Sequence, residues 1–365
     1  MSSQYRNTFG QQYLIIAVNG VAVLSGVFLL NGIIARLFGI EVLGEFLLIK
    51  RTVTTVVSIL LIGLNIGIPY FLNRESEESV YRNSVLIFIL FTLPAIAMFV
   101  VLIRAGFTEG FQINHVLGYG LYTIGICMQF FVYAHYRGRH KFFWASLLQL
   151  SATAIVPVII VNFTDDIQQV LAVIGLVNSL LSGILLILLY RGLPYGNYQL
   201  ERIKIYMKYG LVRFPSFISQ FILLAGPGIL ASSWATYKDV ALVNGNMSLI
   251  RLLLFILGPI GIIMLPRVSG IKHQQQKDKL GYSLAGLLQI TTGIAMIIAA
   301  FLYIFNGKIL TLWYSLDRTE ILPEAKIIIL ALPFYVIAEI LRSPIDGLSY
   351  KGINSKVYGL AAIGF

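Results

Sequence analysis

Apolar residues run in long stretches along most of the chain, separated by short polar segments. Each stretch contains roughly 20 residues, the length that an α-helix needs to cross about 30 Å of hydrocarbon. An eleventh stretch begins near Val357, close to the end of the sequence. The pattern predicts ten complete membrane spans, at residues 13–35, 46–71, 84–103, 116–135, 142–162, 170–190, 207–233, 240–265, 282–305 and 324–349.

The composition supports this interpretation. Of the 365 residues, 58% are hydrophobic and 12% are charged, and the mean hydropathy is +0.83. A soluble fold of this length would need far more polar surface, so we expect an all-α polytopic membrane protein. The net charge of +11 comes from basic residues spread over short loops, which argues against a nucleic-acid-binding domain.

Lysine and arginine are distributed unevenly between the two sets of loops. Loops on the same side of the membrane as the N-terminus hold sixteen of them, whereas loops on the opposite side hold five. In membrane proteins the cytoplasmic loops carry the excess of Lys and Arg. The bias therefore predicts a multi-pass protein whose N-terminus lies in the cytoplasm.

Two short sequence matches indicate an internal repeat. A Tyr-Arg-Gly segment at 136–138 ends the fourth span, and a Tyr-Lys-Gly segment at 350–352 ends the tenth, an offset of 214 residues (350 − 136). Pro69 near the end of the second span corresponds to Pro266 near the end of the eighth, an offset of 197 residues (266 − 69). Six spans separate the members of each pair, so both members have the same orientation in the membrane.

The repeat predicts two pseudo-symmetric lobes of six helices each, related by an axis along the membrane normal. The N-terminal lobe would comprise residues 1–195 and the C-terminal lobe residues 196–365. Adding the offset to the end of the sixth span at Tyr190 places the end of a complete second lobe near position ~404. We therefore expect that 10–11 spans of an expected 12 are present, and that the C-terminal lobe is incomplete.

A few spans carry arginine or lysine where contact with lipid would be unfavourable. A cation within a span is energetically costly, so it usually faces the interior of the bundle and has a function. The first six predicted spans contain no carboxylate that would neutralise it. This pattern is most easily explained by a path for an anionic substrate, with candidate binding residues Arg251, Arg51, Lys50 and Arg213.

These four candidates lie at different depths. Arg251 is near the midplane, too deep for its side chain to reach the headgroups easily. Lys50 and Arg51 sit about one turn inside the second span and point ~100° apart, so we do not expect both to face one lumen. Each would present a cation to a diphosphate or extend to the lipid headgroups. Arg213, beside Pro215, has the same two interpretations.

The tenth span is the only one with acidic residues in its interior. Glu339, Arg342 and Asp346 are spaced three and four residues apart, so they share a helix face and can pair with one another. In a second interpretation they hold a coupling proton or sodium ion, with Glu339 as the main ligand. Polar residues of other spans would line a sugar-binding lumen or form hydrogen bonds between helices; these are Asn19, Asn31, Asn65 and Gln220.

The sequence lacks the side-chain combinations that would indicate an enzyme. Histidine and cysteine do not occur in pairs at the spacing of metal ligands, and there is no glycine-rich ATP-binding loop ending in Gly-Lys. The longest polar connection, 191–207, is too short for a soluble catalytic domain. We therefore expect a protein that is not an enzyme and that has no metal or other cofactor.

Three features of the chain resemble a known group of membrane proteins. A short loop at 38–46 follows the first span, glycine and proline residues at 63–70 end the second, and the basic Tyr-Arg-Gly cluster at 136–138 follows the fourth. In these features the chain resembles the O-antigen and polysaccharide flippases of the multidrug/oligosaccharidyl-lipid/polysaccharide (MOP) exporter superfamily. Members often carry an Asp-Arg pair in the middle of the seventh span, where residues 224–230 of this chain are uncharged.

The resemblance implies twelve or fourteen helices in two V-shaped lobes that work by alternating access in the bacterial inner membrane. The implied substrate is an anionic oligosaccharide linked to a polyprenyl diphosphate, such as the repeat unit of an O-antigen, a capsule or an exopolysaccharide. Further partners would be membrane lipids, a coupling H⁺ or Na⁺ ion and other glycan-assembly membrane proteins.

Two other functions stay open at this point. A drug/cation antiporter of the same superfamily would place a carboxylate inside the N-terminal half to hold a cationic substrate. A membrane-embedded glycan polymerase or acyltransferase would need an extracytoplasmic catalytic loop or a His/Asp pair near the outer face. Neither feature is evident in the sequence, so the sequence favours the flippase.

Overall fold

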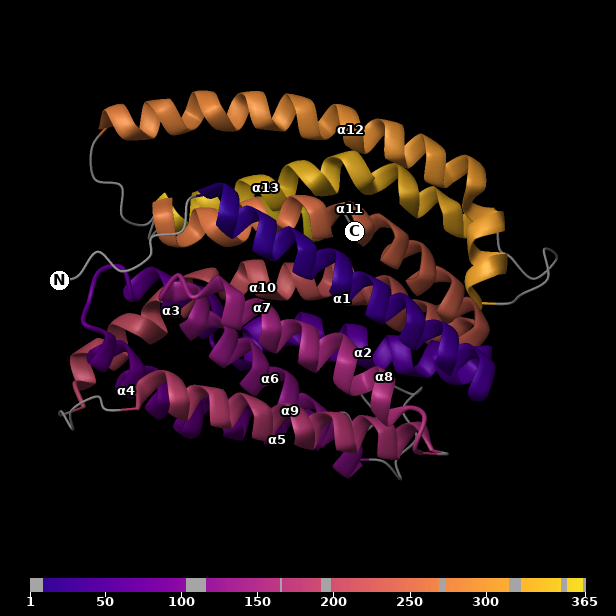
Figure 1. Cartoon of the computed structure of the whole chain (residues 1–365), viewed down its shortest axis with the longest axis horizontal. Coiled ribbons are helices and arrows are strands. Elements are labelled where there is room, and N and C mark those ends of the chain that lie inside the picture. Colours follow the sequence, from indigo (N-terminus) through magenta and orange to yellow (C-terminus); the bar gives the residue numbers. More distant parts are fainter. Residues whose placement is uncertain are drawn as a thin grey trace.

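Long helices run nearly parallel to one axis throughout the computed structural model (Figure 1). The structure describes residues 9–102, 116–164, 166–191, 198–268, 274–314, 323–348 and 353–363, without the side chains of 9, 116, 251–262, 266–267, 274–279 and 323–325. Every regular element in these ranges is helical. The predicted all-α fold is confirmed.

The first half of the chain contributes nine α-helices and two π-helical turns in the described ranges. They are α1 (Phe9–Leu37), α2 (Ile40–Leu60), α3 (Leu64–Phe71), α4 (Glu77–Ile87), η1 (Phe88–Thr92), α5 (Leu93–Leu102), α6 (Val116–Gly138), α7 (Phe142–Leu150), η4 (Ser151–Ile155), α8 (Val156–Ile160) and α9 (Ile167–Tyr190). The second half contributes α10 (Leu200–Trp234), α11 (Tyr237–Val268), α12 (Gln274–Tyr314), the 3₁₀-helix η6 (Pro323–Ala331), α13 (Leu332–Leu348) and α14 (Ile353–Ile363).

The length and apolar character of these helices match a multi-pass membrane protein. Within the described residues, eight helical stretches are long and apolar enough to cross a membrane, or nine if α2 and α3 together form one span. Helix α12 is 41 residues long, so the predicted span 282–305 covers only its middle. Large apolar side chains are exposed along it, among them Ile297, Ile304 and Leu312, as expected for a surface that faces lipid.

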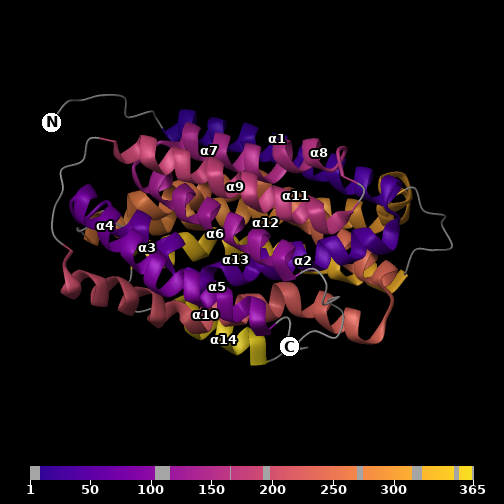
Figure 2. The same cartoon turned by 90° about the horizontal axis from the view of Figure 1, so that it is seen from below.

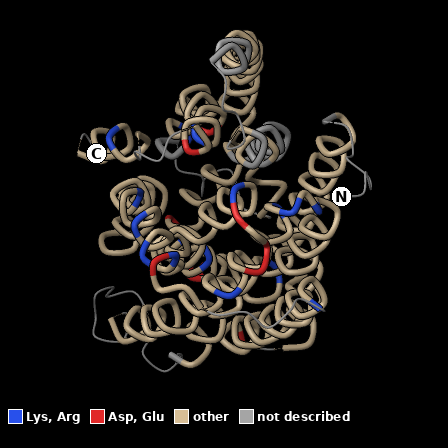
Figure 3. The backbone as a smooth tube through the Cα atoms, turned by 90° about the vertical axis from the view of Figure 1, so that its left-hand side faces the viewer, with Lys and Arg blue, Asp and Glu red and all other residues tan. Residues whose placement is uncertain are grey.

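Charged residues are concentrated at one end and between the helices. We call the end that holds the N-terminus the basic end, because Arg74, Arg137 and Lys204 lie there; it is on the left in Figure 1. Figure 2 shows α10 and α14 along one side of the bundle and α1, α7 and α8 along the opposite side. Figure 3 views the molecule from the basic end, and most of the charged positions lie toward the middle of that view rather than at its outer edge.

Helix α2 connects the two halves of the chain. It packs against α1 and α6 of the first half and against α10 and α11 of the second. Near its start, a Cβ atom on Gly44 would lie 1.9 Å from the carbonyl oxygen of Tyr237, the first residue of α11. Only glycine permits this approach of the two backbones.

The predicted second span, 46–71, is not a single helix. It breaks at residues 61–63, where α2 and α3 meet at a bend of 49°. Ile62 and Gly63 both have positive φ, 50° and 72°, a conformation that ends a helix and favours glycine. The break packs tightly against α10, because a Cβ on Gly63 would lie 2.9 Å from the Cα of Gly210.

Two other spans contain a π-helical turn just before a proline. Turn η1 precedes Pro94 of α5, and turn η4 precedes Pro157 of α8. A proline ring collides with the carbonyl group four residues earlier and cannot donate a hydrogen bond to it. The wider π turn accommodates both effects, so each helix continues across the membrane without a break.

Candidate functional site

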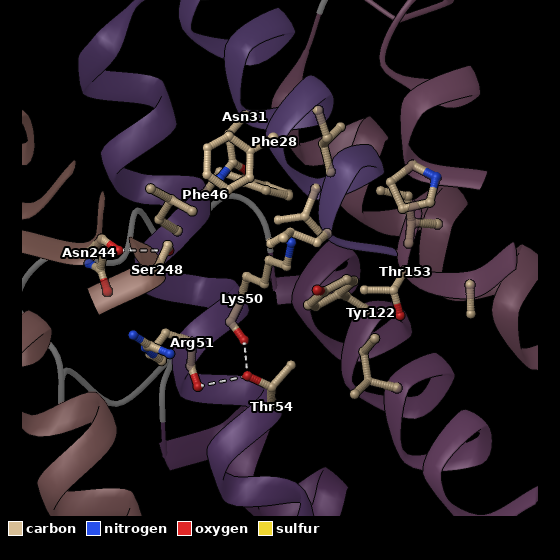
Figure 4. Close-up of a pocket in the computed structure, with 18 of the residues that line it drawn as sticks. Phe28, Asn31, Phe46, Lys50, Arg51, Thr54, Tyr122, Thr153, Asn244 and Ser248 are labelled. Carbon is tan, nitrogen blue, oxygen red and sulfur yellow. Dashed lines mark hydrogen bonds between the residues drawn. The ribbon is translucent and has the colours of Figure 1, made fainter. Parts of the chain in front are cut away.

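A cavity of about 270 Å³ lies between α1, α2, α6 and the helix formed by α7, η4 and α8, with α11 and the end of α12 contributing from the second half (Figure 4). Its lining combines apolar surface with a small number of polar groups, which is the usual composition of a ligand-binding cavity. The polar and charged lining residues are Asn31, Lys50, Arg51, Thr54, Gln129, Gln149, Thr153, Asn244 and Ser248.

Two of the four predicted cations, Lys50 and Arg51, both line this cavity, contrary to the expectation that they would not face one lumen. In Figure 4 their side chains leave α2 in different directions, Lys50 toward the side of Tyr122 and Arg51 toward α11. The Lys50 ammonium is buried and lies 5.6 Å from the centroid of the Phe46 ring, and Arg51 is only 6% exposed. This burial favours contact with a substrate over extension to the lipid headgroups.

None of the described residues that line the cavity is an aspartate or a glutamate. The charged residues in the described lining are therefore both positive. Charges interact more strongly in such a low-dielectric setting than in water. The cavity is consequently suited to a negatively charged group, provided that the group also brings hydrogen-bond acceptors for the ammonium and the guanidinium.

Of the four uncharged polar residues predicted to line a lumen, only Asn31 does so in the described structure. The other three form hydrogen bonds to neighbouring side chains: Asn19 to Gln149 (3.2 Å), Asn65 to Ser58 (2.8 Å) and Gln220 to Ser216 (3.2 Å). Asn31 is fully buried, and its Oδ1 and Nδ2 atoms have no hydrogen-bond partner among the described residues.

The π-helical turn η4 forms part of the cavity wall. Ala152 and Thr153 of this turn line the cavity, and the Thr153 hydroxyl accepts a hydrogen bond of 3.3 Å from Nε2 of Gln129 on α6. The sequence predicted a continuous helix here and missed the turn, although Pro157 was a signal for it. π-Helical turns occur frequently at functional sites, which supports the assignment of the cavity as the site.

A stacked aromatic pair joins the two halves of the chain at the cavity. Phe28 of α1 and Trp313 of α12 both line it, and their ring centroids are 3.8 Å apart at an interplanar angle of 13°. Trp313 also donates a hydrogen bond of 3.1 Å from Nε1 to the carbonyl oxygen of Phe28. No pattern in the sequence pointed to this contact, because the two residues are 285 positions apart.

Arg213 lies outside the lining of the cavity and is 1% exposed. Its Nε atom is 3.3 Å from Oδ1 of Asp346 on α13, and its Nη2 donates to the backbone carbonyl of Asp346 at 3.2 Å. The guanidinium also stacks on Tyr209, with its central carbon 3.6 Å from the ring centroid. In this conformation Asp346 holds Arg213, which reaches neither the cavity nor a lipid headgroup.

The pairing predicted along the tenth span is found in part. Arg342 and Glu339 form an ion pair of 3.6 Å on α13, as the spacing of three residues predicts. Asp346 instead pairs with Arg213 of α10. Arg251, the remaining cation, belongs to α11, and its side chain lies outside the described residues.

No protein-family model matches the sequence, and no curated protein matches it either. Solved structures share its fold. An outward-facing multidrug resistance MATE family transporter of the MOP superfamily superposes with a TM-score of 0.73, over 98% of this chain and 87% of its own, at 12% sequence identity. The fold is that of the MATE transporters. A Vibrio cholerae MATE transporter gives a TM-score of 0.72 with the same coverage and 13% identity.

A third structure, the MATE multidrug transporter DinF-BH, covers 100% of this chain and 97% of its own at a TM-score of 0.64 and 12% identity. The fold class that the sequence predicted is therefore confirmed, and the structures that share it are transporters rather than enzymes. At this level of identity the likeness concerns the fold alone, so the chemistry of the cavity has to be argued from its own residues.

The predicted second span left out two acidic residues near the start of helix α2, Glu41 and Glu45. Helix α2 begins at Ile40, six residues before the predicted span, so Glu45 lies within it. Its Oε1 atom accepts hydrogen bonds of 3.1 Å from the Tyr119 hydroxyl and from Nε2 of Gln168. The expectation that the first six spans contain no carboxylate was based on the apolar run alone and is wrong at this point, but Glu45 does not line the cavity.

Proposed function

We propose that this protein is a transporter of the MOP type that moves an anionic polyprenyl-diphosphate-linked oligosaccharide across the bacterial inner membrane by alternating access. The observation that carries the proposal is the cavity, whose described lining includes the Lys50 ammonium and the buried Arg51 and contains no aspartate or glutamate. The diphosphate is the part of such a lipid that supplies the matching negative charge and the oxygen acceptors.

The geometry of the two cations fits a ligand with two phosphoryl groups. Lys50 and Arg51 leave adjacent positions of α2 in different directions (Figure 4), so each would contact a different phosphoryl group. The arginine offers a planar fork that binds two oxygens, whereas the lysine acts as a point charge. Arg251 of α11 is proposed as a further contact near the midplane, and Arg213 would become available only after its ion pair with Asp346 opens.

The transport cycle is part of the same proposal. The lobes of residues 1–195 and 196–365 would rock against each other with the N-terminus in the cytoplasm. Glu339, with Arg342 and Asp346 on the same helix, is the proposed site of a coupling H⁺ or Na⁺ ion. Membrane lipids and other glycan-assembly membrane proteins are the partners that such a cycle implies.

The proposal is tested with the purified protein in liposomes that contain a polyprenyl-diphosphate-linked oligosaccharide. The measurement is the appearance of the glycan on the opposite leaflet, where an impermeant lectin can bind it. Arg51→Ala and Lys50→Ala should each slow this movement about tenfold or more, because each removes a charge-assisted contact. Arg36→Ala, which removes an exposed cation at the end of α1, is the control and should leave the rate unchanged.

A drug/cation antiporter is the second candidate. The solved structures that share the fold include multidrug transporters, and Glu45 of α2 gives the first half a carboxylate. The same liposomes decide between the two, with uptake of a fluorescent organic cation measured beside lipid movement. Cation uptake without lipid movement would establish the antiporter, and lipid movement that is insensitive to Arg51→Ala and Lys50→Ala would remove the cavity from the proposal.

A further inference from the structure

Asn31 is a buried amide that lines the cavity with neither polar atom paired. Its side chain is 0% exposed, and Oδ1 and Nδ2 have no hydrogen-bond partner within the described part of the chain. Buried polar groups in native proteins are nearly always paired, so an unpaired amide requires an explanation. A ligand that enters the cavity and supplies both a donor and an acceptor is the explanation that fits its position.

The surroundings of Asn31 indicate which part of a ligand would contact it. Phe28 precedes it by one turn of α1, and Figure 4 shows Asn31 beside Phe28 and Phe46 on one side of the cavity. The Lys50 ammonium lies 5.6 Å from the centroid of the same Phe46 ring. The unpaired amide and the aromatic surface therefore adjoin the cationic part of the cavity. A group that binds there would be close to whatever anion Lys50 holds.

The volume of the cavity limits the size of that group. At about 270 Å³, the cavity falls just below the ~300–1,000 Å³ of pockets that enclose a whole drug-sized ligand. In this conformation it has room for a diphosphate and a small group attached to it, but not for an oligosaccharide. The remainder of a long glycan would have to lie outside.

We infer that Asn31 determines specificity for the sugar bonded directly to the diphosphate, and that the cavity does not recognise the sugars beyond it. The inference rests on the proposed function and specifies which part of the substrate the same cavity recognises. A sugar hydroxyl or acetamido group donates to Oδ1 and accepts from Nδ2. An ionised diphosphate offers acceptors only, so without the sugar Oδ1 of Asn31 stays unpaired.

The test measures binding through the fluorescence of Trp313, which lines the cavity. The chain has three tryptophans, and the other two, Trp144 and Trp234, are exposed, so replacing both with Phe leaves Trp313 as the single reporter. The probes are three short-chain polyprenyl diphosphates: one without sugar, one with a single N-acetylglucosamine, and one with a trisaccharide that begins with the same sugar.

We expect the single sugar to tighten binding about tenfold relative to the undecorated lipid, as one to two buried hydrogen bonds would. The trisaccharide should bind within about twofold of the one-sugar lipid. Asn31→Leu should abolish the tenfold gain, so that the one-sugar lipid and the undecorated lipid bind this variant with equal affinity. Asn178→Leu is the matched control, because Asn178 is equally buried and has an unpaired Oδ1 but does not line the cavity.

Each outcome supports or overturns the inference. A tenfold gain that survives in Asn31→Leu, or that is lost equally in Asn178→Leu, removes Asn31 from the site while the proposed function stands. A trisaccharide that binds ten times more tightly than the one-sugar lipid shows that the protein recognises the distal sugars, which contradicts the inference. If no lipid diphosphate binds the parent, the inference and the proposed function fail together. Should Asn31→Leu not fold, Asn31→Ser, which keeps one hydroxyl, should retain part of the gain.

Discussion

The buried ion pair between Arg213 of α10 and Asp346 of α13 leads to a sharp prediction about stability. The two side chains are 1% and 6% exposed, so removing one of them leaves the other charge without a counter-ion in the interior. In Asp346→Ala the Arg213 guanidinium would lose the carboxylate at Nε and keep its contacts to backbone carbonyls and to the Tyr209 ring. We expect this variant to be strongly destabilised.

The magnitude follows from the burial of the pair. Removing one partner of a buried ion pair typically destabilises a protein by about 3–5 kcal/mol. The Glu339–Arg342 pair on the same helix is less buried, at 28% and 22%, with a longer separation of 3.6 Å, so breaking it should cost less than breaking the Arg213–Asp346 pair. Glu339→Ala is therefore the matched control. The double variant Arg213→Met/Asp346→Ala should regain much of the loss, because no buried charge is then left unpaired.

The assay is thermal unfolding of the purified variants in one detergent, followed by the loss of helical circular dichroism or by the exposure of Cys127, which is buried in the folded protein. The expected order of midpoints is parent, Glu339→Ala, double variant and then Asp346→Ala. A midpoint for Asp346→Ala no lower than that of Glu339→Ala would refute the reasoning. In that case Asp346 would not be needed to hold Arg213 in the fold, and its role would have to be sought in ion coupling.

Three further predictions concern topology, the midplane cation and the break in the second span. A reporter fused after Arg139 should be active only in the cytoplasm and one after Asp166 only outside; the reverse pattern would invert the proposed orientation. Arg251→Ala should lower glycan export about ten- to a hundredfold at matched expression, with partial rescue by Arg251→Lys; unchanged export would make Arg251 a structural cation. Gly210→Ala should lower the unfolding midpoint by the equivalent of about 1–3 kcal/mol, because its Cβ would lie 1.8 Å from the carbonyl oxygen of Ile62; an unchanged midpoint would show that the break yields without cost.

Hydropathy predicted the helices best where the apolar run and the helix coincide. Helix α9 extends from Ile167 to Tyr190, and the predicted span was 170–190. Helix α12 continues at both ends beyond 282–305, because backbone hydrogen bonds define a helix and these do not require apolar side chains. The bend between α2 and α3 lies inside an apolar run, so hydropathy alone missed it, although Gly63 and Pro69 marked the region.

The candidate site was predictable in its charges but not in its pairings. The sequence places Lys50 and Arg51 inside a span, and the cost of a cation in lipid already indicates that they face protein. Their position in a cavity, and the pairing of Arg213 with a carboxylate 133 residues away, depend on which helices are neighbours. A single sequence carries no local signal for that choice, since every span presents a similar apolar surface.

Helix α2 places the two cations between two close contacts of the first half of the chain with the second half. Gly44 lies against Tyr237 near the start of α2, and Gly63 lies against Gly210 just after its end, with Lys50 and Arg51 between these contacts. Both contacts bring backbones close together, and at Gly63 the buried Phe217 ring also lies against the contact. In the proposed alternating-access cycle, one end of α2 would release the second half while the other end stays in contact. The cavity would then open toward each side of the membrane in turn.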